Sequence, residues 1–149
     1  MTEVTAPWDI DPGIENARRF FQLVPKVFPE ATLFVAEGGR ITSAVIAVYR
    51  QHSTTATNIP ELQGLTLRNR HICRFSPELF RDLARLARES SRTALLDHLS
   101  LYQNERWLLE WHDAFANAIL LDATLPEATI AALAHPFRVR YGRAHFRAP

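Results

Sequence analysis

The stretch Leu95 to Asp122, LLDHLSLYQNERWLLEWHDAFANAILLD, decides the fold. It contains three apolar runs, separated by polar breaks at Asn104-Glu105 and at 113–117. Short apolar runs bounded by turn-forming residues are typical of β-strands joined as hairpins. The sequence therefore predicts a three-stranded antiparallel meander over about residues 96–122.

The turn position also predicts a register. With Asn104 and Glu105 at the turn centre, residues whose numbers sum to 209 pair, so that Ser100 faces Leu109. This register places the largest side chains on the face expected to lie under the helices: Tyr102, Trp107, Leu109, Trp111, Ile119 and Leu121. The turn lacks glycine, and a slip of one residue would exchange the two faces of the strand.

The opposite face of the meander holds the candidate acid/base residues. In the same register Asp97 lies across from His112, and Glu110 lies among leucines, where desolvation disfavours a charged carboxylate. A catalytic hypothesis assigns Glu110 as general acid or base and Asp97 as the group that orients the His112 imidazole. The alternative is a solvent-facing surface with ordinary charge pairs, which is the commoner use of polar strand residues. Because no nucleophile elbow or phosphate-binding loop is present, the sequence favours a protein that is not an enzyme.

The flanking segments predict helices and further strands. Proline at the first helical position marks starts at Asp11-Pro12 and Ser76-Pro77, and Thr124 to Glu127 matches a capping box. Residues 41–52 fit either a strand or a helix, and we favour the helix; residues 32–37 and 71–75 predict strands. The expected fold is a two-layer α+β domain spanning residues 1–149, with helices packed on a mixed or antiparallel sheet. Residues 1–10 and about 142–149 are expected to be loosely ordered.

Composition limits the protein class. The chain has 149 residues, 47% of them hydrophobic, and a net charge of +1. With a single cysteine, Cys73, no intramolecular disulfide can form; the N-terminus lacks a secretory signal, and no apolar run is long enough to span a bilayer. We therefore expect a cytoplasmic protein without a membrane partner. The abundance of arginine and alanine is a weak indication of a bacterial source.

No cofactor and no metal site are expected. The six histidines show no metal-binding spacing. Cys73 lies between Ile72 and Arg74, so an activated thiolate is conceivable, but a buried and inert cysteine is the commoner case.

Two arginine-rich segments are candidate binding surfaces. Arg68, Arg70 and Arg74 form the first, and Arg138 and Arg140 belong to the second. If the two segments met in the fold, they would offer contacts either to phosphates or to a protein partner. Near-neutral net charge and the absence of a nucleic-acid-binding motif disfavour nucleic acid. We expect a protein that binds a protein partner or itself; the alternatives are a small enzyme or ligand-binding protein with a site around Glu110 and His112, and nucleic-acid binding.

Overall fold

A computed structural model describes residues 5–55, 59–62 and 69–144 of the chain. The α-helices are α1 (Ala17–Val27), α2 (Ser43–Gln51), α3 (Pro77–Leu86), α4 (Arg92–Leu95) and α5 (Glu127–Ala134), and the 3-10 turns are η1 (Pro60–Leu62) and η2 (His135–Phe137). The strands are β1 (Trp8–Ile10), β2 (Leu33–Glu37), β3 (Arg70–Arg74), β4 (His98–Gln103), β5 (Arg106–Trp111), β6 (Ile119–Leu121) and β7 (Tyr141–Arg143).

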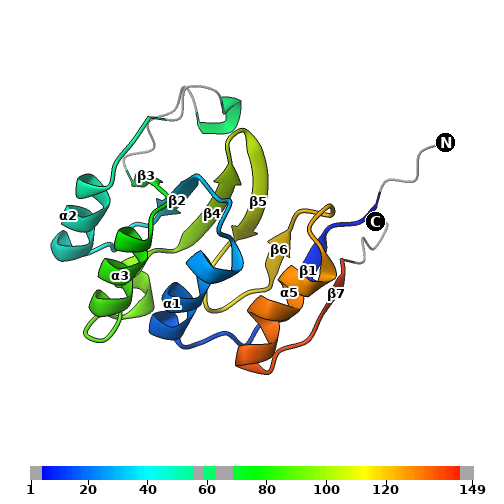
Figure 1. Ribbon diagram of the computed structural model, residues 1–149. Helices are drawn as coiled ribbons and strands as arrows, with labels where there is room; N and C mark the ends of the chain where they lie inside the picture. Colours follow the sequence, from blue (N-terminus) through cyan, green and yellow to red (C-terminus); the bar gives the residue numbers. More distant parts are fainter. Residues whose placement is uncertain (1–4, 56–58, 63–68, 145–149) are drawn as a thin grey trace.

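The strands form one antiparallel sheet of seven, in the order β3-β2-β4-β5-β6-β1-β7. Figure 1 shows the larger helices α1, α2, α3 and α5 side by side over one face of this sheet. The predicted two-layer α+β class is confirmed, and the sheet is larger than the predicted meander. The helices expected within 41–52, after Ser76 and after Thr124, and the strands expected within 32–37 and 71–75, are present.

The first helix begins later than predicted. Asp11-Pro12 does not start it, because Gly13 takes a φ of 140°, a conformation incompatible with a helix. The cap is Asn16, whose side-chain oxygen accepts a hydrogen bond from the Arg19 amide at 3.0 Å. Pro25 lies in the last turn of the helix, which ends two residues later at Val27.

The expectation of a loosely ordered N-terminal arm is wrong for residues 8–10. They form β1, which inserts between β6 and β7 in the sheet. Trp8 is buried, donates its indole N–H to the Leu125 carbonyl at 2.9 Å, and lies under the Arg143 guanidinium. The C-terminal segment is likewise ordered as far as β7, because pairing with β1 satisfies its backbone.

The meander is present as β4, β5 and β6, and its first turn lies where predicted. Asn104 adopts a φ of 54°, a left-handed conformation that asparagine tolerates, and its amide donates to the Thr32 hydroxyl at 2.6 Å. Asn104 therefore adopts the left-handed backbone conformation that glycine adopts in other tight turns.

The register beyond this turn differs from the prediction because β5 contains a bulge. Tyr102 pairs with Trp107 as expected, but Leu101 pairs with Leu109, so Leu108 is the extra residue. From that point the sum of paired residue numbers rises by one, and Glu110 rather than Leu109 faces Ser100. The predicted aromatic face is consequently divided between the two faces of the sheet.

Under the helices, the core is formed by apolar side chains from strands and helices together. Trp111 packs against Phe20 and Phe115, with ring centroids 4.9 Å and 4.7 Å apart, and its indole N–H donates to the Asn117 carbonyl. Tyr102 and Trp107 instead join Val35 and Ile59 in a smaller cluster on the open face. Among the described residues, the largest of the fully buried side chains all belong to this helix-covered core.

Candidate functional site

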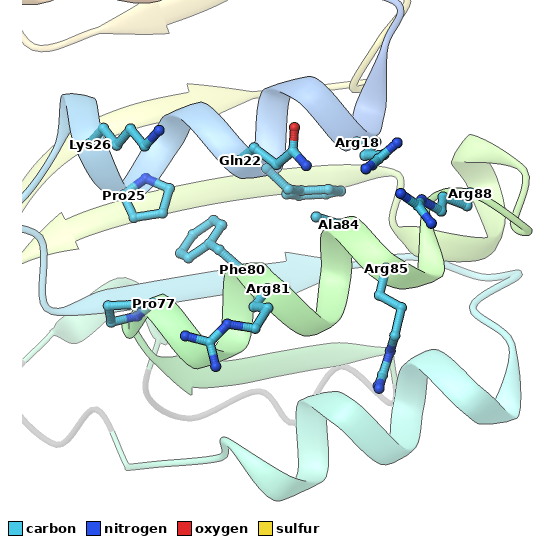
Figure 2. Close-up of a pocket in the computed structure, with 11 residues that line it drawn as sticks. Arg18, Gln22, Pro25, Lys26, Pro77, Phe80, Arg81, Ala84, Arg85 and Arg88 are labelled. Carbon is cyan, nitrogen blue, oxygen red and sulfur yellow. The ribbon is translucent and has the colours of Figure 1, made fainter.

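A groove runs along the outer surface between α1 and α3 (Figure 2). Ser76 caps α3 by accepting a hydrogen bond from the Leu79 amide at 3.2 Å, and Pro77 occupies its first turn. Each helix turns an apolar stripe toward the core, and their outward residues line a volume of about 570 Å³. We call this the basic groove, and its lining residues are Arg18, Phe21, Gln22, Pro25, Lys26, Pro77, Phe80, Arg81, Ala84, Arg85 and Arg88.

The basic groove carries one sign of charge. Its described lining contains no carboxylate, and its charged side chains are Arg18, Lys26, Arg81, Arg85 and Arg88, all exposed. Arg18 and Arg88 lie opposite one another across one end of the groove, whereas Arg85 extends toward α2 (Figure 2). A carboxylate oxygen of Asp82 lies 3.5 Å from Arg85, and the other four cations form no ion pair with any residue that the structure describes. The groove therefore concentrates positive potential on a nearly neutral protein.

The floor of the groove is apolar but closed. Phe21 and Phe80, whose ring centroids are 6.3 Å apart, are 0% and 1% exposed, respectively. Pro25 and Pro77 remain partly or fully exposed at one end. The site can thus contact apolar atoms at its rim and anionic atoms along its length, but no ring offers an open face for stacking.

Sequence reasoning missed this groove. The i, i+4, i+7 spacing of Arg81, Arg85 and Arg88 places these three side chains on one side of the helix. That spacing was an available signal. The apposition of α3 with α1 was not, because it depends on helix packing between segments some 60 residues apart.

Of the predicted acid/base residues, Glu110 and His112 come together. Nε2 of His112, which is exposed, lies 2.7 Å from Oε1 of Glu110, which is partly exposed on the open sheet face. Asp97 is not joined to them by any described contact. Its carboxylate accepts a hydrogen bond from the Gly39 amide at 3.1 Å.

The bulge explains why Asp97 is elsewhere. A register shifted by one residue brings His98, not Asp97, beside His112, and their ring centroids are 5.2 Å apart in an edge-on arrangement. Nδ1 of His98 accepts a hydrogen bond from the Asp113 amide at 3.1 Å. The expected pairing of Asp97 with His112 is therefore wrong, and the neighbouring ring is an imidazole already engaged with the backbone.

The two arginine segments do not meet. Arg70 and Arg74 lie on β3 at one edge of the sheet, while Arg138 and Arg140 precede β7 at the other edge. Arg70 is paired with Glu37 at 2.7 Å, and Arg68 lies outside the described residues. The described arginines of the two segments therefore do not form one common binding surface.

Cys73 is buried, and its thiol lies 3.4 Å from the Tyr49 carbonyl oxygen as a hydrogen-bond donor. Burial raises the pKa of Cys73 to about 12, which opposes formation of a reactive thiolate. Burial, and secondarily the nearby Arg50 charge, lowers the pKa of His71. Among the described residues, no group of three or more histidine, cysteine or acidic side chains is placed to hold a metal ion.

Comparison with known proteins found no matching family model, no similar curated protein and no similar solved structure. Within the part of the chain that the structure describes, no helix has the length and apolar character needed to span a membrane.

Proposed function

We propose that this protein is a non-enzymatic binding protein whose basic groove takes an acidic, amphipathic helix of a partner protein. The observation that carries the proposal is the groove lining, which has five cationic side chains and no carboxylate. Four of these cations make no ion pair with described residues, so a partner would meet few competing internal contacts. Arginine side chains also bind carboxylates through paired hydrogen bonds.

The dimensions of the groove favour a short helix as the occupant. The 10 residues of α3 correspond to about 15 Å of helix axis, or roughly three turns. A helix laid between two helices is a common recognition mode, in which apolar anchors contact the groove and polar residues contact its rim. Here the anchors would contact Pro25 and Pro77 at the rim, and the acids would face Arg18, Arg81 and Arg88.

Nucleic acid is the less favoured occupant. The buried rings of Phe21 and Phe80 give unstacked bases no platform, although stacking supplies much of single-strand affinity. The net charge of +1 also provides little long-range attraction for a polyanion.

The test measures binding of synthetic helical peptides of about 14 residues by amide NMR shifts. One peptide carries glutamates along one face and leucines along the other, and a matched peptide has glutamine in place of each glutamate. The glutamate peptide is expected to shift amides of α1 and α3 and to bind at least about tenfold more tightly than the glutamine peptide. Oligothymidylate of about 20 nucleotides, tested in parallel, reports nucleic-acid binding and its salt dependence.

Two variants with equal changes of charge locate the surface. Substitution of Arg18, Arg81 and Arg88 by glutamate is expected to weaken the glutamate peptide about tenfold or more, since each exposed pair contributes up to about 1 kcal/mol. The control replaces Arg74, Arg138 and Arg140, which lie outside the basic groove, by glutamate. Because salt screens the interaction between distant exposed charges, this variant is expected to change the peptide affinity less than about twofold. Equal losses in the two variants, shifts outside α1 and α3, or tighter binding of the oligonucleotide than of the peptide would overturn the proposal.

A further inference from the structure

The face of the sheet that is turned away from the helices contains a hollow of about 400 Å³. It lies over five strands and beside η1, and we call it the sheet-face hollow; its described lining is Val35, Glu37, Leu62, Arg70, Ser100, Tyr102, Trp107, Glu110 and Leu120. Its volume falls in the range of about 300–1,000 Å³ that is usual for sites of small molecules. Nothing in the proposed function of the basic groove uses this surface.

Part of the lining of the sheet-face hollow is aromatic and apolar. The bulge in β5 turns Trp107 to this face, where it packs with Val35 and Tyr102. Leu62 of η1 contributes a further apolar wall. Trp107 remains partly exposed, so its ring is accessible to a ligand in the hollow.

The lining of the hollow also contains two carboxylates, Glu37 and Glu110. Glu37 is neutralised by Arg70, with 2.7 Å between carboxylate oxygen and guanidinium Nε. Glu110 lies in the middle of the sheet, between Ser100 and Leu120 of the adjacent strands. Its Oε1 is 2.7 Å from Nε2 of His112, and its Oε2 makes no hydrogen bond with any residue in the described ranges.

We propose that the sheet-face hollow binds a small organic amine, with its ammonium group on Glu110 and its apolar part on Trp107. The Glu110 carboxylate attracts an ammonium group through its charge, and this attraction strengthens when water is displaced. The Trp107 ring offers apolar contact area to the rest of the ligand. The described lining contains two carboxylates and one guanidinium, and this excess of negative charge disfavours an anionic ligand. His112 acts as a positioning residue, since contact with Oε1 leaves Oε2 available to the ligand.

The first experiment uses the unmodified protein and three probes of similar size: phenethylamine, the neutral 2-phenylethanol and the anionic 3-phenylpropanoate. Indole N–H signals in NMR spectra distinguish the tryptophans. Trp8 and Trp111 donate theirs to the Leu125 and Asn117 carbonyls and serve as internal controls. Phenethylamine is expected to move the Trp107 signal with a dissociation constant of about 1–10 mM, typical of a fragment of this size.

The comparison of probes tests the charge. The alcohol and the anion are each expected to bind at least about tenfold more weakly than the amine, since neither can pair with Glu110. No Trp107 shift at about 20 mM amine, or equal affinity for the alcohol, would overturn the proposal without any variant.

Substitution then tests the assigned acid. Glu110→Gln keeps the side-chain shape and is expected to weaken phenethylamine at least about tenfold while leaving 2-phenylethanol unchanged. Glu105→Gln removes an exposed acid at the hairpin turn and is expected to change amine affinity less than about twofold. Unchanged amine affinity in folded Glu110→Gln, verified by its circular dichroism, would show that Glu110 is not the binding group.

Discussion

The two faces of the sheet use alternate residues of the same strands, yet they differ in packing. On the helix-covered face, Leu101, Leu109 and Trp111 are 1% exposed or less and contact helices. On the open face, Trp107 and Glu110 are partly exposed and border the sheet-face hollow. The difference shows that a residue's type did not decide its environment, because two tryptophans of one strand, four residues apart, lie on opposite faces.

The largest expected effect is the difference between these two tryptophans. Trp111→Ala removes a ring packed on Phe20 and Phe115 and should lower the free energy of unfolding by about 3–5 kcal/mol. Trp107→Ala removes a partly exposed ring beside the hollow and should cost about 1 kcal/mol. Urea denaturation of both variants measures this contrast, and equal losses would mean that the two faces are packed alike.

A smaller effect concerns ionisation on the helix-covered side. The pKa of Cys73 is raised by burial to about 12 from an ordinary value of 9.0, so the thiol form stabilises the folded state. This contribution is complete below pH 9 and is lost as pH rises toward 12, because the unfolded chain ionises first. Between pH 8 and 10 the unmodified protein should lose about 1.4 kcal/mol more than Cys73→Ala.

Urea titrations of both proteins at each pH measure this difference. Parallel pH profiles would show that Cys73 is not shielded from water in the folded protein.

The smallest effect is expected at the polar end of β5 and β6. Burial acts to raise the pKa of Asp122, but hydrogen bonds from Thr124 and Arg106, together with the Arg106 charge, outweigh it and lower the pKa. The carboxylate therefore stabilises the fold above its ordinary pKa near 3.8, and this stabilisation is lost as pH falls below that value.

Asp122→Asn should cost about 0.5–1 kcal/mol at pH 7, the range of a partly exposed pair, and progressively less in acid. Asp11→Asn is the matched control, since its exposed side chain makes no described hydrogen bond. Thermal unfolding at pH 7 and near pH 3 compares the three proteins; a deficit that grows in acid would contradict the assigned direction of the pKa change.

Local signals in the sequence predicted most of the helices and strands, but they predicted few of the contacts between them. The cap at Ser76 and the turn at Asn104 depend on residues close in the chain, and both are found where predicted. The helix start at Asp11 failed because the backbone of Gly13 takes a left-handed conformation that no pattern of apolar residues reveals. The strand at Trp8 was missed because three residues are too short to show alternation.

For the candidate sites, the sequence identified Glu110 and His112 as neighbours, since i and i+2 share a strand face. It assigned the wrong third residue, Asp97, because one bulged residue at Leu108 moved the register. It assigned no role to the basic groove, whose two walls come from helices distant in the chain.

By itself, then, the stretch from Leu95 to Asp122 determined a meander of three strands and the place of its first turn, because pleating and turn conformation are set by adjacent residues. Only the tertiary structure decided which face each side chain of β5 occupies, because the bulge depends on packing against both layers. Tertiary packing also determined that α1 and α3 bring their cations into one groove, since burying two apolar stripes side by side leaves the outward residues adjacent.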